Sequence, residues 1–133
     1  MQESLTLAQE LSHPFSLSFA LHCAAVFHTL RRERQAAQER AEALIALSTE
    51  QGFALRMAAG TTLRGWALAE QGQGEEGIAQ MCQGLALCRT AGAELWTPFS
   101  LALLAEAYRK VGQAEEGLTV LAGERMGGRS CIG

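Results

Sequence analysis

Along most of the chain, apolar residues recur at steps of three and four positions, the spacing that places them on one face of an α-helix. No stretch alternates apolar and polar residues in the way that a half-buried strand does. Glycines and prolines divide the pattern into segments. We therefore predict an all-α fold, with helices at about residues 3–12, 15–31, 34–49, 53–71, 75–90, 93–111 and 114–124.

The helical pattern repeats about every forty residues. Residues 104–118 align with residues 64–78, and both align more weakly with residues 24–37. A period of this length is typical of a solenoid, in which each helix pair buries its apolar face against its neighbours. We expect a single domain of about three antiparallel helix pairs over residues 1–125, followed by a flexible tail at 126–133 that lacks any period.

Small residues occupy matching places in the repeats. A glycine inside a helix destabilises it by about 0.5–1 kcal/mol relative to alanine, so its recurrence indicates that helix backbones approach closely there. The matching positions are Ala25, Gly65 and Ala105 in the first helix of each pair, and Ala37, Gly77 and Gly117 in the second.

Composition and charge exclude several classes of protein. The chain has 133 residues, of which 48% are apolar and 19% charged, so it is not disordered. A net charge of −3 provides no basic surface for nucleic acid or for an anionic membrane. No apolar run spans a bilayer and the first four residues are acidic and polar, so we expect a cytoplasmic protein. We expect reduced, structural thiols at Cys23, Cys82, Cys88 and Cys131.

The sequence offers no convincing catalytic or metal-binding arrangement. His22 and His28 are six positions apart, which does not align two rings on one helix face. The run 72–77 fits the G-x-G-x-x-G pattern, but a helix precedes it and two glutamates stand where a phosphate would bind. We expect a protein that is not an enzyme and that holds neither a metal nor a cofactor.

The repeats resemble the tetratricopeptide repeat (TPR) family, which places a leucine and a small residue before an aromatic residue, then a turn glycine, then a small residue. Leu104, Ala105, Tyr108, Gly112 and Gly117 follow this pattern. The period is nearer forty than thirty-four residues, and the closing proline of the motif is missing. The resemblance implies a right-handed superhelix of helix hairpins that binds proteins.

The long repeat, rich in alanine and leucine, is similar to the C-terminal repeat region of large bacterial signalling ATPases and of regulators linked to adenylate cyclases. The resemblance rests on residues 92–95, 101–108 and 112–118. It implies a sensor or scaffold segment of a signalling protein. The catalytic activities of those proteins do not transfer, because the chain contains no nucleotide-binding or cyclase domain.

In such a superhelix the first helix of each pair lines a concave face, so its non-packing positions become candidate contacts for a bound peptide or partner helix. Trp66 is the candidate anchor, with packing between neighbouring helices as the alternative interpretation. Two other functions stay open: sensing of a small molecule in the same groove, and self-association to a homodimer through residues 114–124. The candidate binding residues are Phe19, His22, Thr62, Trp66, Glu70, Phe99, Glu106, Arg109 and Lys110.

Overall fold

The computed structural model describes residues 14–90 and 97–112, and within these ranges every regular element is an α-helix. The prediction of an all-α fold is thereby confirmed for this part of the chain. The helices expected at 3–12 and 114–124 and the tail at 126–133 lie outside the described residues. No described helix combines the length and apolar character needed to cross a membrane. The helices are α2 (Pro14–Leu30), α3 (Arg34–Gln51), α4 (Ala54–Glu70), α5 (Gly74–Thr90) and α6 (Thr97–Lys110).

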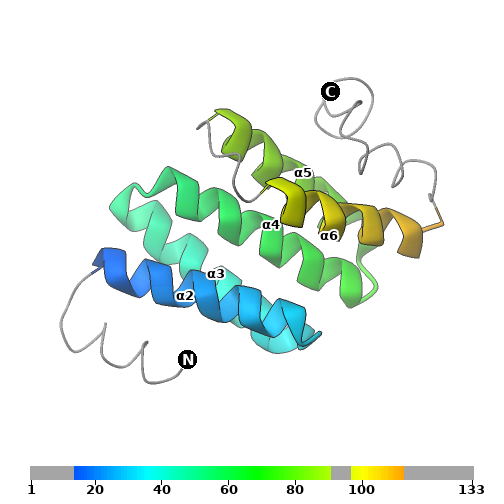
Figure 1. Cartoon of the computed structure of the whole chain (residues 1–133), viewed down its shortest axis with the longest axis horizontal. Helices are drawn as coiled ribbons and strands as arrows, with labels where there is room; N and C mark the ends of the chain where they lie inside the picture. Colours follow the sequence, from blue (N-terminus) through cyan, green and yellow to red (C-terminus); the bar gives the residue numbers. More distant parts are fainter. Residues whose placement is uncertain (1–13, 91–96, 113–133) are drawn as a thin grey trace.

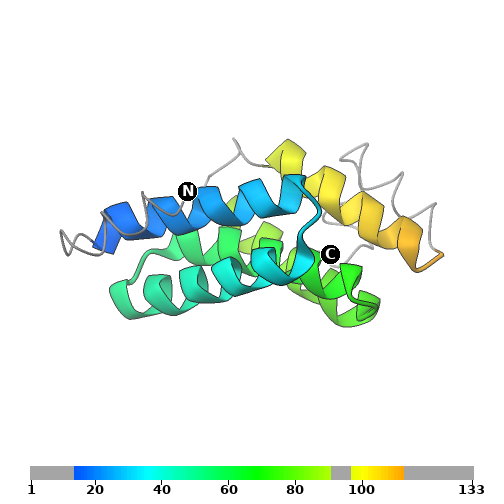
Figure 2. The same ribbon diagram turned by 90° about the horizontal axis from the view of Figure 1, so that it is seen from below.

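Each helix runs back along the one before it and packs against it, so the chain advances as a series of antiparallel hairpins (Figures 1 and 2). Helix α4 also contacts α2 on one side and α6 on the other, and it therefore lies at the centre of the molecule. We call the side of the molecule formed by α2, α4 and α6 the α2/α4/α6 face.

The forty-residue period of the sequence is present in the backbone. Helix α3 begins at Arg34 and α5 at Gly74, forty positions later. The second residue after the first helix of each hairpin has a positive φ every time: 63° at Arg32, 92° at Gly72 and 83° at Gly112. The first two of these turns also contain equivalent hydrogen bonds. The backbone amides of Glu33 and Gln73 each donate to the carbonyl five residues earlier, at 2.8 and 3.0 Å. Equivalent positions of the repeat therefore adopt equivalent conformations.

The small residues of the repeat mark where the backbones of α4 and α5 meet. A methyl group on Gly65 would lie 2.6 Å from the carbonyl oxygen of Gly77 and 2.8 Å from the amide nitrogen of Met81. Further along the same two helices, a methyl group on Gly84 would lie 2.8 Å from the carbonyl oxygen of Ala58. No side chain fits at these points, which confirms the close approach expected from the sequence. We call this contact line the α4/α5 seam.

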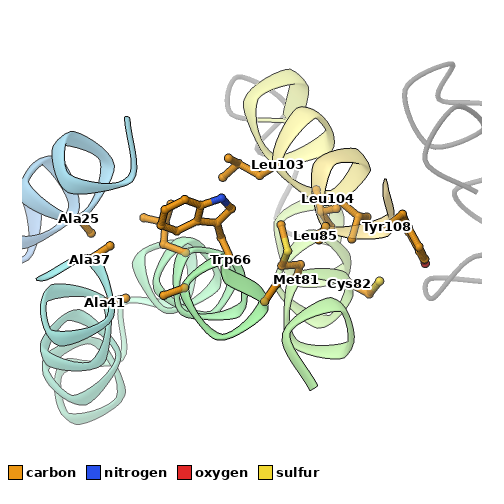
Figure 3. Packing of buried hydrophobic residues seen from close by; sticks show 14 residues of the cluster. Ala25, Ala37, Ala41, Trp66, Met81, Cys82, Leu85, Leu103, Leu104 and Tyr108 are labelled. Carbon is orange, nitrogen blue, oxygen red and sulfur yellow. The ribbon is translucent and has the colours of Figure 1, made fainter. Parts of the chain in front are cut away.

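A single apolar cluster joins all five helices, and Figure 3 shows how its members lie. On the side of α2 and α3 the cluster is made of alanines, of which Ala25, Ala37 and Ala41 are completely buried. On the side of α5 and α6 it is made of larger side chains such as Met81 and Leu104. The central α4 supplies the one large aromatic side chain that spans these two sides, Trp66.

The cysteines fit the sequence expectation only in part. Cys23 and Cys88 are free thiols, as expected. Cys82 is disulfide-bonded, so the expectation of a reduced thiol is wrong at this position. Six-residue spacing on a helix excludes a bond between Cys82 and Cys88 but does not exclude a partner elsewhere in the fold. Cys131 lies outside the described residues.

Replacing Gly65 with alanine tests the α4/α5 seam. The new methyl group would overlap backbone atoms of α5, which cannot rotate away as a side-chain end can. We expect Gly65→Ala to lower the free energy of unfolding by roughly 2–3 kcal/mol, although alanine favours a helix over glycine. Urea denaturation followed by circular dichroism measures the change.

The control for this substitution is Gln83→Ala on the exposed surface of α5, which we expect to change stability by no more than about 0.5 kcal/mol. A Gly65→Ala protein as stable as the wild type would show that the seam does not limit the packing of these helices.

Candidate functional site

The α2/α4/α6 face contains a pocket of about 410 Å³, a volume that includes the solvent at its mouth. Its floor comes from the first half of α4, and its walls come from the middle of α2, the end of α5 and the start of α6. The lining is mainly apolar, which is typical of surfaces that take up a side chain or a small molecule. The lining residues are His22, Val26, Leu55, Arg56, Ala59, Thr62, Leu63, Cys88, Phe99 and Ser100.

Aromatic side chains from α2 hold an arginine beside this pocket. The guanidinium carbon of Arg56 lies 5.4 Å from the ring centre of Phe15 and 5.2 Å from that of Phe19, within the range of cation–π attraction. Phe15 also meets the ring of Phe53 edge to face, at 5.5 Å between centres. Phe15 and Phe19 remain 60% and 53% exposed, which is unusual for rings of this size. They provide a surface to which a partner could add apolar contacts.

The second contact of Arg56 is with His22, whose side chain is buried. Nη1 of Arg56 lies 2.8 Å from Nδ1 of His22. Because a guanidinium only donates hydrogen bonds, Nδ1 accepts, and the ring proton is therefore on Nε2. Burial, and secondarily the charge of Arg56, lower the pKa of His22 to about 4. At neutral pH the histidine is thus an uncharged acceptor that orients Arg56.

Trp66 does not lie on the surface of the α2/α4/α6 face. Its side chain is 1% exposed and fills the space between Ala25 and Ala37 on one side and Leu103 on the other (Figure 3). Of the two interpretations offered by the sequence, packing between neighbouring helices is therefore the one that agrees with its burial. A fully buried ring has no surface left with which to anchor a peptide.

Charged residues close the other end of the face, beyond Trp66. The indole Nε1 of Trp66 donates to Oε1 of Glu106 at 3.1 Å, and Nη1 of Arg32 donates to the same oxygen at 2.6 Å. Lys110 pairs with Glu70 at 3.1 Å. The hydrogen bond from Arg32 is the main cause that lowers the pKa of Glu106, and the one from Trp66 adds to it. Of the charged residues expected to select a partner, Glu70 and Lys110 thus pair with each other, and Glu106 pairs with Arg32.

The nine candidate residues thus separate into groups. His22, Thr62 and Phe99 line the pocket, and Phe19 lies beside it on Arg56. Glu70, Glu106 and Lys110 take part in ion pairs beyond Trp66. Trp66 is in the core, and Arg109 is exposed near the end of α6.

Arg56 was not among the residues expected from the sequence. On α4, two steps of three positions lead back from the expected Thr62 through Ala59 to Arg56. The two rings that hold it come from α2, which the spacing of residues along α4 does not reveal. Only the periodicity of α4, extended by one turn, could have drawn attention to it.

The described residues point neither to a metal site nor to a reactive thiol. Within residues 14–90 and 97–112, no cluster of histidine, cysteine or acidic side chains could hold a metal ion. Burial raises the pKa of the Cys88 thiol, which disfavours the reactive thiolate form. The pocket offers apolar surface, one guanidinium and one neutral imidazole, together with the side chains of Thr62, Cys88 and Ser100.

Comparison with known proteins identifies no relative. No protein-family model, no curated protein and no solved structure matches the chain.

Substitutions at Glu106 test the buried contact with Trp66. Glu106→Gln keeps an oxygen that can accept the indole proton, whereas Glu106→Leu leaves a buried N–H without an acceptor. We expect the leucine variant to be less stable than the glutamine variant by roughly 1–3 kcal/mol in urea denaturation.

The control is a Trp66→Phe background, which has no indole N–H. The difference between the two Glu106 variants should shrink to a few tenths of a kcal/mol there, because the remaining donor to residue 106, Arg32, is exposed and can be solvated by water. An unchanged difference would mean that the indole hydrogen bond is not its cause.

The lowered pKa of His22 predicts a dependence of stability on pH. The unfolded chain takes up a proton at this residue near pH 6.5, but the folded chain resists it until about pH 4. Stability should therefore fall as the pH is lowered, with this residue contributing about 2 kcal/mol of the loss between pH 7 and 5.

The measurement is the difference between wild type and His22→Gln, because glutamine can still accept from Arg56 but does not titrate. The variant should lose less stability than the wild type over this interval. Parallel pH curves for the two proteins would show that His22 is not held in its neutral form.

Proposed function

We propose that the chain is a non-catalytic interaction module of the TPR type, in which helix hairpins stack into a right-handed superhelix and bind a peptide or partner helix. The equivalent turns at Arg32, Gly72 and Gly112 support a true structural repeat, and the order of helix contacts agrees with hairpins that stack in sequence. The resemblance to repeat segments of bacterial signalling proteins supports a role as a segment of such a protein.

The observation that carries the proposal is the position of the pocket. It opens on the α2/α4/α6 face, which is the face that the first helices of successive hairpins share. The partly exposed rings of Phe15 and Phe19 extend its apolar surface along α2. A pocket for one side chain, continued by an exposed aromatic surface, suits an extended or helical peptide that runs along the face.

The alternatives have less support. A closed pocket lined by Trp66, His22 and Phe19 would favour sensing of a small molecule. Of these three residues only His22 lines the pocket, and Trp66 is in the core. Self-association was expected through residues 114–124, which lie outside the described residues.

Filling the pocket tests the proposal. Peptides are selected from a library of random linear peptides on the immobilised full chain, and their affinities are then measured for wild type and for Ala59→Phe. Because Ala59 lines the pocket, the added ring should occupy it and weaken binding roughly tenfold or more, which corresponds to about 1.4 kcal/mol.

The matched control is Ala46→Phe, the same substitution at an exposed position of α3, which should leave binding unchanged. Thermal melting followed by circular dichroism checks that both variants fold. The proposal fails if no peptide is selected, or if a folded Ala59→Phe protein binds the peptides as tightly as the control does.

A further inference from the structure

The charges of the α2/α4/α6 face are arranged unevenly. At the end beyond Trp66, Arg32 is paired with Glu106 and Lys110 with Glu70. At the pocket end, Arg56 forms no ion pair with any residue of the described ranges, and its hydrogen-bond acceptor is a histidine without charge at neutral pH. Among the described residues, the acids and bases at one end of the face are therefore paired, whereas at the other end no carboxylate pairs with Arg56.

The guanidinium of Arg56 is also held in place. The rings of Phe15 and Phe19 both lie within cation–π distance of it, and His22 accepts a hydrogen bond from Nη1. Because these contacts already restrict the side chain, it loses less conformational entropy when it binds a ligand. They also displace part of the water around the guanidinium. A charge-assisted hydrogen bond to such a group is stronger than one to a mobile surface arginine.

The pocket lies directly beside this group, because Arg56 is itself one of its lining residues together with Val26, Leu63 and Phe99. A ligand that places an apolar side chain in the pocket therefore brings its neighbouring groups to the guanidinium. The chain as a whole has a net charge of −3, so an acidic ligand would be attracted by this local group and not by a general positive field.

We propose that the α2/α4/α6 face selects peptide segments in which an aspartate or glutamate side chain neighbours a large apolar residue, with the carboxylate on Arg56 and the apolar side chain in the pocket. This inference rests on the proposed function and specifies the class of peptide. The charge and the planar geometry of a guanidinium suit a carboxylate better than a neutral amide.

The test compares the peptides selected from the random library by the wild-type chain and by two variants of Arg56. Arg56→Gln removes the charge but keeps a donor for His22, and Arg56→Glu reverses the charge. The wild type should enrich acidic residues next to large apolar ones. The glutamine variant should keep the apolar preference and lose the acidic one, and the glutamate variant should enrich lysine and arginine in place of acids.

Selected peptides are then synthesised with blocked ends, each beside a version in which glutamine replaces the glutamate. For wild type this replacement should weaken binding roughly tenfold, whereas for Arg56→Gln it should change binding by less than about twofold. Arg89→Gln, at an exposed position of α5, is the control with the same change of net charge and should behave as wild type does.

The outcomes separate the two proposals. Peptides that bind without an acidic preference, or an acidic preference that survives in folded Arg56→Gln, would overturn the role of Arg56 while leaving the interaction module intact. A library that yields no binding peptide would overturn both. A preference that Arg89→Gln also loses would mean that net charge, and not Arg56, selects the ligand.

Discussion

The packing of α4 against α5 depends on an almost complete absence of side chains between them. Gly65 and Gly77 face each other across the seam, and Gly84 lies against the backbone of α4 near Ala58. Because the two backbones come so close, their separation leaves little freedom for the helices to slide or rotate. The glycines weaken each helix on its own by about 1 kcal/mol apiece, and only the tertiary contact compensates for this.

The seam determines what the rest of α4 can do. With one side of the helix taken up by α5, and α3 packed against another, the remaining side forms the floor between α2 and α6. Trp66 occupies one part of that floor, where the neighbouring residues of α2 and α3 are alanines and leave room for an indole ring. At Ala59, about two turns earlier, the small side chain on the same side of the helix leaves a pocket instead. Core and site are thus consecutive parts of one helix surface.

The two ends of the α2/α4/α6 face differ in how their polar groups are satisfied. Near Trp66 the indole N–H must have an acceptor because it is buried, and Glu106 serves both this donor and Arg32. Arg32 adopts a left-handed backbone conformation, where the equivalent positions carry glycine, and it reaches Glu106 from there. This end is closed by its own ion pairs. At the pocket end, aromatic rings and a neutral histidine hold Arg56, and no carboxylate of the described residues pairs with it, which is the basis for the acidic ligand proposed above.

Local properties of the amino-acid sequence were sufficient for the helices, the forty-residue repeat and the crossing points of α4 and α5. Helical periodicity, turn glycines and recurring small residues act over a few positions, so each could be identified without knowledge of its neighbours in space. The face that carries the candidate site was expected from the resemblance to helix-hairpin repeats, and His22, Thr62 and Phe99 of the residues expected there do line the pocket.

The roles of the individual side chains on that face depended on contacts between distant parts of the chain. Glu106 meets Arg32 across 74 positions and Trp66 across 40, and Arg56 meets His22 across 34. Spacing along one helix does not reveal which of these groups will be buried or which charges will find a partner. Burial and charge compensation arise only when α2, α4 and α6 come together, and for that reason the tryptophan became core and the unnoticed arginine became the candidate contact.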